Sequence, residues 1–234
     1  MSPSQSVLGV HGGSIDDVWS TAFYISSTAG GDPGPFTAHG IYLGVKAAAK
    51  RALGADSMQG VRVAVQGVGS VGGSLARKLA KDGAVLTIAD VDGARAQKLA
   101  DEIGAKTADP AEILTLECDI VSPNALGAIL DERTIDQLQC KAVAGGANNQ
   151  LAMRADGARL FDRGILYAPD YVINAGGIIN VGLEYLGQGD RAEVEARIDR
   201  IPARLIEVWD ESDSTGDPHA EVADRIAQRL IGRG

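Results

Sequence analysis

The stretch Val61–Ala80, VRVAVQGVGSVGGSLARKLA, decides the fold. An apolar strand pattern runs directly into Gly67-x-Gly69-x-x-Gly72 and then into a helical pattern. In this arrangement Gly67 permits a tight turn from strand to helix, Gly69 lets the backbone approach a pyrophosphate, and Gly72 lets the helix pack closely on the strand. The free N–H groups at the start of the helix and the positive end of its dipole then face the phosphates. The stretch therefore predicts a dinucleotide-binding unit.

An acidic residue follows at the end of the next strand pattern, AVLTIADVD. This residue, Asp90, lies eighteen residues beyond Gly72, where the dinucleotide fingerprint places an acid. A carboxylate there accepts hydrogen bonds from the adenosine ribose hydroxyls and repels a 2′-phosphate, so we expect NAD rather than NADP. The alternative is a glycine turn in a flavodoxin-like domain, in which Asp90 only caps its strand.

Short runs rich in Val and Ile alternate with helical patterns from Ala47 to about Gly187, as is typical of strand–helix units around a parallel sheet. The expected strands are Val61–Gln66, Ala84–Asp90, Asp119–Val121, Lys141–Ala144 and Ile165–Tyr167. The expected helices between them are Val71–Lys81, Ala94–Ile103 and Ala152–Arg163. We therefore predict an α/β fold of the Rossmann type, a doubly wound parallel sheet with extra C-terminal helices.

Helical patterns also flank this region. Thr37–Leu53 has a single apolar stripe and follows Pro35, which suits a helix start. Glu193–Asp210 and Pro218–Leu230 are amphipathic, and Asp217 is expected to cap the second of them. Near the N-terminus a helix is possible over Asp16–Ile25. The stretch that follows it is dense in turn formers and is expected to be a loop or hinge, Ser26–Pro35.

The composition is that of an ordinary globular protein, and 234 residues fit one large domain with at most a small appendage. A net charge of −9 argues against nucleic acid as a partner, because Lys and Arg are needed to displace counterions from phosphate. We expect a cytoplasmic protein with no membrane partner, since no signal sequence and no run near the ~18 apolar residues of a span occurs. Cys118 and Cys140 lack C-x-x-C spacing, so we predict reduced thiols and no metal site.

Five segments carry a further pattern, in the order GGDPGPFTAHGIYLGVKAAAK, VAVQGVGSVGGSLA, ECDIVSPNALGAIL, AVAGGANNQLA and GILYAPDYVINAGGIINV. Together they resemble the branched-chain and aromatic amino acid dehydrogenases, the leucine, valine and phenylalanine dehydrogenase group. The resemblance covers most of the chain, and PDYVINAGG and AGGANNQ are not general features of dinucleotide-binding domains. It implies oxidative deamination, in which hydride passes from the α-carbon of an amino acid to NAD and water then attacks the imine.

The resemblance also implies a set of cofactor contacts. Thr37 matches the threonine that contacts the nicotinamide carboxamide, and Asn174 matches the asparagine that orients the nicotinamide. Asn124 stands where relatives often have cysteine. The other matches are the glycine turn, the ribose acid, the loop beside the nicotinamide ribose and two further contacts, namely Gly67, Val68, Gly69, Ser70, Gly72, Asp90, Pro123, Asn124, Ala147 and Asn148.

Three positions match the substrate site of the family. Asn149 matches the asparagine that touches the amino acid, and Ile178 and Val181 match positions that line the pocket for its side chain. Apolar, β-branched residues there suit an aliphatic side chain better than a large aromatic one. The alternatives are structural, because Asn174 would cap a helix that begins near Gly177, while Ile178 and Val181 would be core positions one helical turn apart.

The catalytic lysines of the family lie in an N-terminal domain, one of them in a G-G-G-K segment. None of the seven lysines in this chain follows a glycine run. In an ungapped alignment, Val10 takes the place of the family's catalytic aspartate, with His11 beside it. We therefore assign no catalytic residue. The expected organisation is a remnant or hinge of a missing catalytic domain (1–35), an NAD-binding domain (36–187) and C-terminal helices that pack on or near it (188–234).

Three hypotheses follow from this pattern. The first is a truncated dehydrogenase of a branched-chain or aromatic amino acid, which binds its small substrate only when a catalytic domain or partner chain completes it. The second is a non-enzymatic NAD-binding protein that pairs with or regulates a full-length relative. The third is an NAD-dependent enzyme of another kind, with Glu184 or Asp170 as its acid. A homo-oligomer is expected if the apolar surface left by a missing domain pairs with a second copy.

Overall fold

The strands are short apolar runs whose side chains alternate between two covered faces of one sheet. The computed structural model describes residues 33–187 and 190–232. In β1 (Arg62–Gln66), Val63 and Val65 join the core on one face, whereas Ala64 joins the core on the other. Because both faces are covered, the strands read as nearly continuous apolar runs.

Six parallel strands form the sheet in the order β3-β2-β1-β4-β5-β6. Besides β1 they are β2 (Val85–Ala89), β3 (Lys106–Thr107), β4 (Ile120–Pro123), β5 (Ala142–Val143) and β6 (Leu166–Tyr167). This order is that of dinucleotide-binding sheets and differs from the flavodoxin-like order, so the predicted fold class is confirmed and that alternative is wrong. The sequence did not predict β3, which has only two residues, both exposed.

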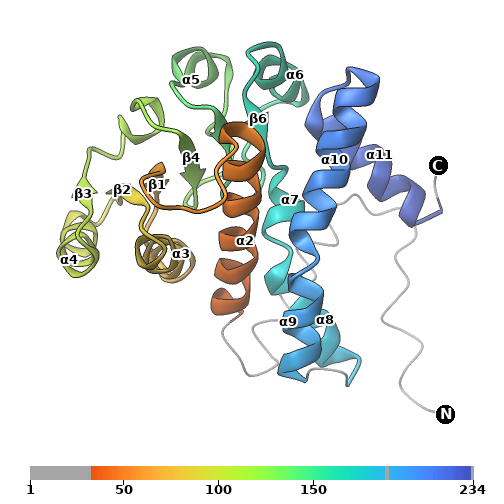
Figure 1. Ribbon diagram of the computed structural model, residues 1–234, viewed down its shortest axis with the longest axis horizontal. Coiled ribbons are helices and arrows are strands. Elements are labelled where there is room, and N and C mark those ends of the chain that lie inside the picture. The colour runs from red at the N-terminus through yellow and green to blue at the C-terminus, as the bar shows by residue number, and fades with distance from the viewer. Residues whose placement is uncertain (1–32, 188–189, 233–234) are drawn as a thin grey trace.

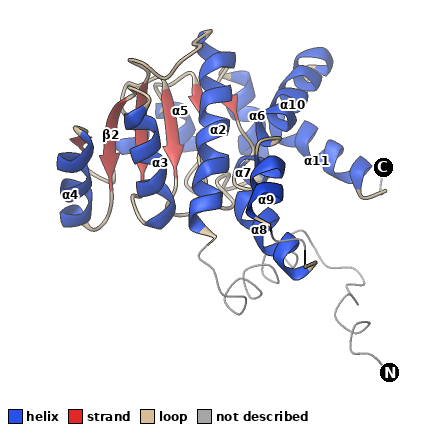
Figure 2. Cartoon of the chain, turned by 60° about the horizontal axis from the view of Figure 1, so that its bottom comes forward, coloured by secondary structure: helices blue, strands red, loops and turns tan. Residues whose placement is uncertain are grey.

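Helices cover both faces of the sheet (Figure 2). One core cluster joins strand residues to α2 (Gly34–Leu53), α3 (Ser70–Lys81) and α4 (Gly93–Ile103). The other core cluster lies under the short helix η1 (Ile113–Thr115), α5 (Glu132–Gln137) and α6 (Arg154–Asp162). The apolar stripe predicted for the first helix is buried at Ile41, Val45, Ala48 and Ala49.

The C-terminal helices pack along the β6 edge of the sheet (Figure 1). They are α7 (Asp170–Ile173), α8 (Gly176–Tyr185), α9 (Arg191–Ile198), α10 (Ile201–Thr215) and α11 (His219–Leu230). Helix α10 contacts α2 and α7, and α11 contacts α6. The indole N–H of Trp209 in α10 donates to the carbonyl of Tyr167 in β6 at 3.0 Å, and Trp209 is fully buried. The segment after α8 is therefore anchored to the sheet.

Two predictions about these helices are wrong. The helix expected over Glu193–Asp210 is divided into α9 and α10, because Pro202 has no N–H to continue the hydrogen bonding of α9 and instead occupies the first turn of α10. Asp217 does not cap α11, since Pro218 holds the cap position and the Asp217 carboxylate pairs with Arg225 at 2.9 Å.

The predicted loop over Ser26–Pro35 is wrong at its end, because Gly34 and Pro35 already form the first turn of α2, where proline is favoured. The rest of that loop and the helix expected over Asp16–Ile25 lie outside the described residues.

Both cysteines are free, as predicted, with Cys118 buried and Cys140 half-buried. Burial raises the pKa of the Cys118 thiol to about 11 and that of Cys140 to about 12, so both remain protonated at neutral pH and are poor nucleophiles. Across residues 33–187 and 190–232, no helix combines the length and apolar character that crossing a membrane requires.

The imidazole of His219, at the start of α11, makes stability depend on pH. The residue is 7% exposed and its ring meets the edge of Phe161. Burial lowers its pKa from 6.5 to about 4, so the folded state resists protonation while the unfolded state does not. The contribution of His219 to stability is fully present above the pKa of the unfolded state, and it is lost as the pH falls toward the folded-state pKa of about 4. We expect the free energy of unfolding to drop by about 2 kcal/mol between about pH 8 and about pH 5 through this group.

Urea unfolding of His219→Gln at the two pH values measures this contribution, because glutamine is neutral throughout. His39→Gln, which leaves His219 in place, is the control and should keep the drop. An equal drop in His219→Gln and in the wild type would contradict the assignment.

Candidate functional site

The glycine turn joins β1 to α3 at the carboxyl edge of the sheet. Gly67 has a φ of +81°, a conformation that L side chains rarely adopt, and Gly69 is extended just before Ser70 begins α3. Among the described residues, a Cβ on Gly69 would have one atom within 4 Å, Arg95 Nη1 at 3.9 Å. The backbone at Gly69 is therefore open to an incoming group, and its contact with a pyrophosphate stays a prediction.

Gly72 fixes how closely α3 approaches this turn. A Cβ at position 72 would overlap the carbonyl oxygen of Gly67 and also crowd Asn124. The helix thus begins nearer to β1 than any side chain at position 72 would allow, which is the close packing predicted for the third glycine of the motif.

Asp90 lies directly after β2, and its carboxylate faces the glycine turn. Oδ2 accepts the N–H of Val68 at 2.8 Å, and Oδ1 accepts the N–H of Asp92 at 2.9 Å. The Asp90 side chain is 7% exposed, and Arg95 Nη1 lies 3.7 Å from Oδ2. Each carboxylate oxygen has more than one lone pair. Asp90 can therefore hold the turn and still accept a hydrogen bond from a hydroxyl group of a ligand.

Asn124 follows β4 and connects three segments. Its backbone N–H donates to Gln66 in β1 at 2.7 Å, and its side-chain Oδ1 accepts the N–H of Gly146 at 3.0 Å. Its Nδ2 donates to Ser122 through both the carbonyl (2.9 Å) and the hydroxyl (3.0 Å). Pro123 precedes it as the last residue of β4, whose partner is β1. This place, where the strand order reverses, is where open parallel sheets bind ligands.

Asn174 joins the loop after β5 to the end of α7. Its Nδ2 donates to Asn148 Oδ1 at 2.7 Å and to the carbonyl of Gly146 at 3.3 Å. Its own Oδ1 is buried and accepts no hydrogen bond within the described part of the chain. Because α8 begins after Ala175 without a side-chain cap, the prediction that Asn174 caps a helix near Gly177 is wrong. Ala147 lies in the same loop and is buried.

Thr37 lies in the same region, although α2 is far from Asn174 in the sequence. Its hydroxyl donates to the carbonyl of Pro33 at 3.1 Å, within the first turn of α2. A Cβ on Gly177 would lie 2.5 Å from Thr37 Oγ1, so the starts of α2 and α8 are in close contact. The fold therefore brings Thr37 next to the segment that carries Asn174.

The three residues assigned to substrate differ in burial. Asn149 is exposed and has a positive φ of 51°. In α8, Ile178 is half-buried, whereas Val181 is 6% exposed and fits the alternative of a core position. Their contact with a substrate stays a prediction.

Two glutamines that are not among the predicted site residues also lie in this region. Gln66 ends β1, and its Oε1 is buried without a hydrogen-bond donor in the described residues. Gln150 is fully buried and donates through Nε2 to the carbonyls of Gly145 (2.7 Å) and Ala147 (3.0 Å). A polar residue at the end of the apolar strand run was the available signal for Gln66.

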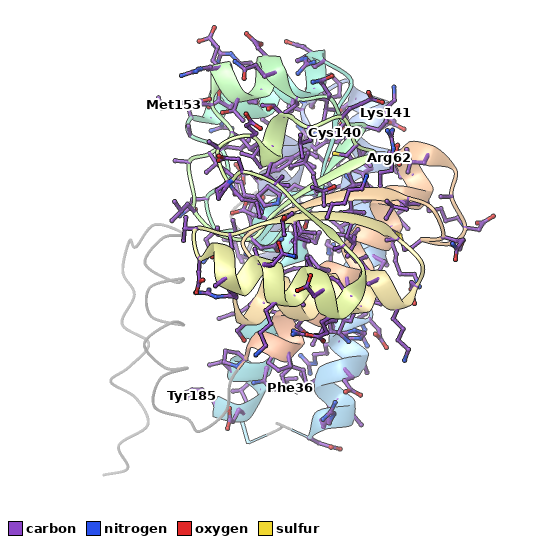
Figure 3. The ribbon with its side chains drawn as sticks, turned by 90° about the vertical axis from the view of Figure 1, so that its left-hand side faces the viewer. Phe36, Arg62, Cys140, Lys141, Met153 and Tyr185 are labelled. Atoms are coloured by element: carbon purple, nitrogen blue, oxygen red, sulfur yellow. The ribbon has the colours of Figure 1, made fainter. Side chains whose placement is uncertain are left out.

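Lys46 and Lys141 both lie away from this edge of the sheet. Lys141 lies near Arg62 (Figure 3), at the edge where the strands begin, whereas the glycine turn lies at the carboxyl edge. Lys46 binds Asp82 at the far end of α3 from the glycine turn. Glu184 is exposed near the end of α8, and among the described residues no cluster of His, Cys, Asp and Glu is suited to a metal ion.

Comparison with known proteins identifies the family. Residues 34–107 and 95–229 match the family described as Glutamate/Leucine/Phenylalanine/Valine dehydrogenase. The chain is 46% identical over 201 residues to leucine dehydrogenase from Thermoactinomyces intermedius, covering 86% of this chain and 55% of that protein. It is 40% identical over 208 residues to L-tryptophan dehydrogenase from Nostoc punctiforme, covering 88% of this chain and 58% of that protein.

The crystal structure of L-tryptophan dehydrogenase from Nostoc punctiforme superposes with a TM-score of 0.82 at 38% identity, covering 86% of this chain and 61% of that one. The chain thus spans a little over half the length of these relatives. Since the family match extends from α2 into α11 and the sheet order agrees with it, the chain belongs to the glutamate/leucine/phenylalanine/valine dehydrogenase family.

Proposed function

We propose that this chain is the NAD-binding part of an amino acid dehydrogenase that acts on a branched-chain or aromatic amino acid. The observation that carries the proposal is the glycine turn at the point of strand reversal, where Gly69 is open and Asp90 lies beside it. The leucine and tryptophan dehydrogenases among its relatives support the substrate class.

The residues present fit NAD at both ends of the site. At one end, the N–H groups at the start of α3 and the open backbone of Gly69 suit a pyrophosphate, while Asp90 suits the adenosine ribose. At the other end, the buried Oδ1 of Asn174 has no donor in the part of the chain that the structure describes. A carboxamide N–H of nicotinamide would satisfy it, since a buried acceptor left unpaired is costly. Thr37 lies beside the same segment.

Bound NAD would supply the hydride acceptor for oxidation of the amino acid α-carbon. The chain's own contribution is to bind and orient. Asn174 and Asn148 are already fixed to each other, so their geometry is set before a ligand arrives. The described residues offer no lysine at this edge to hold a substrate carboxylate or to move a proton, so we propose that a separate domain or partner chain supplies these groups.

The open space at Gly69 gives a sharp test of cofactor binding. Gly69→Ala places a methyl group where the unliganded protein has room, so we expect unchanged stability and NADH affinity at least about tenfold weaker. Gly72→Ala is the matched comparison and should lower the melting temperature, because its methyl group overlaps Gly67. Titration of NADH fluorescence together with thermal unfolding separates the two effects. Full NADH affinity in a folded Gly69→Ala protein would refute the pyrophosphate site.

Asp90 should determine the choice between NAD and NADP. Asp90→Asn removes the charge, so we expect NADH to bind at least about tenfold more weakly, because hydrogen bonds to charged groups contribute ~1.5–3 kcal/mol. Discrimination against NADPH should fall at the same time, since the repulsion of its 2′-phosphate is gone and Arg95 remains. The measurement is a pair of titrations, with NADH and with NADPH. Asp109→Asn, an exposed aspartate that binds its own turn, is the control. If the wild type bound NADH and NADPH equally well, Asp90 would not determine the choice of cofactor.

Catalysis is expected only when a separate domain or partner chain supplies the proposed lysines. The purified chain with NAD and leucine, phenylalanine or tryptophan should form no NADH, because it lacks a lysine at the site. Addition of the separately expressed N-terminal part of the Thermoactinomyces leucine dehydrogenase should produce turnover if the missing groups are the only deficit. Turnover by the chain alone would show that it holds a base of its own. NADH binding without any turnover in the mixture would favour a non-enzymatic, regulatory role.

A further inference from the structure

Two non-glycine residues with left-handed backbones face each other at the carboxyl edge of the sheet. Ala128 has a φ of 55° and Asn149 a φ of 51°, and among residues 33–187 and 190–232 they are the only non-glycine residues with positive φ. The N–H of Ala128 donates to the carbonyl of Asn149 at 2.6 Å. Most L residues are disfavoured in this region, Asn less so than Ala, and such strain persists only where the surrounding structure holds it.

A single carboxylate holds the other side of Asn149. Asp170, the first residue of α7, accepts the N–H of Asn149 on Oδ2 at 2.5 Å. Its Oδ1 lies 3.5 Å from the hydroxyl of Tyr167, and the groups that act on the carboxylate within the described part of the chain are backbone N–H groups and not an arginine or lysine. The carboxylate of Asp170 is therefore directed at backbone N–H groups and not at a cation.

The loop that contains Asn149 is otherwise fixed by neutral side chains. Gln150 binds the carbonyls of Gly145 and Ala147, and Asn174 binds Asn148. A change of φ at Asn149 would rotate the peptide that joins it to Asn148. The amide of Asn148, and with it the partner of Asn174, would then move away from its present position.

We propose that Asp170 is a positioning residue, which holds Asn149 in its left-handed conformation and thereby sets the Ala147–Asn149 loop for the cofactor. The inference rests on the proposed NAD site and adds a residue that does not itself contact the ligand. It also changes the role of Asp170 from the acid of an alternative enzyme to a support for its neighbour, because Oδ2 is already engaged by Asn149.

The test uses two substitutions. One removes the Asp170 carboxylate, and the other replaces Asn149 with glycine, which adopts a positive φ without that carboxylate. Asp170→Ala should weaken NADH binding at least about tenfold, because the loop loses a charge-assisted hydrogen bond. Asn149→Gly in the same chain should restore affinity to within about threefold, since glycine adopts positive φ without support. Asn149→Gly alone is the reference for the double variant, because it removes the amide side chain while Asp170 stays in place. Should Asp170→Ala fail to fold, Asp170→Asn, which keeps one acceptor, should show a smaller loss with the same rescue.

Asp156 provides a matched control. It is 2% exposed and accepts the N–H of Met153 at 2.7 Å, so Asp156→Ala removes an equivalent hydrogen bond at the start of α6. We expect lower stability and unchanged NADH affinity in that variant. Loss of stability alone in Asp170→Ala would reduce Asp170 to the same structural role. A loss of NADH affinity that Asn149→Gly does not rescue would also overturn the proposal.

Amide hydrogen exchange distinguishes this proposal from the proposed function. In the cofactor-free protein, the N–H of Asn149 should exchange faster in Asp170→Ala than in the wild type, while amides in β1 are unchanged. If the wild type binds no NADH, the proposed function fails, and the exchange at Asn149 still decides whether Asp170 holds the loop. Equal exchange in the two proteins would contradict the proposal whatever the NADH titration shows.

Discussion

The carbonyl oxygen of Gly67 occupies the place where a side chain at position 72 would begin. This contact sets the distance between α3 and the end of β1. Because β1 is flanked by β2 and β4, the turn lies at the centre of the sheet, and both neighbours are tied to it. Asp90 binds the N–H of Val68 on one side, and the N–H of Asn124 binds the carbonyl of Gln66 on the other. A wider turn would displace both Asp90 and Asn124. The absence of a side chain at Gly72 therefore determines the geometry of the site.

Neutral amide side chains organise the remainder of the site. Asn124 donates to Ser122 in β4, whereas Gln150 and Asn174 donate to backbone or side-chain oxygens of the loop that follows β5. A buried amide avoids the desolvation cost of a buried charge and can donate inward while its oxygen remains free. In Asn174 this leaves a buried acceptor that finds no donor among the described residues, and the side-chain oxygens of Gln66 and Gln150 are in the same position.

The sequence predicts the parts of this fold whose causes are local. The positions of Gly67, Gly72 and Asp90 can be predicted because a strand, a turn and a helix must follow each other with fixed spacing. The division between α9 and α10 was missed although Pro202 marks it, because the apolar pattern continues across it. The short β3 has no apolar signal. The contact of Asp170 with Asn149 joins the start of α7 to the loop after β5, and no periodicity in either segment predicts it.

The two ends of the site draw on very different lengths of chain. The end with the glycine turn is built by a continuous segment, from β1 through the start of α4. The end with Asn174 requires Thr37, at the start of α2, to meet Gly177 at the start of α8. Contacts between distant segments form more slowly than local ones, and chains begin to fold from the N-terminus during synthesis. The first end can therefore form on the ribosome well before the second, for which α2 must wait until α8 has been made.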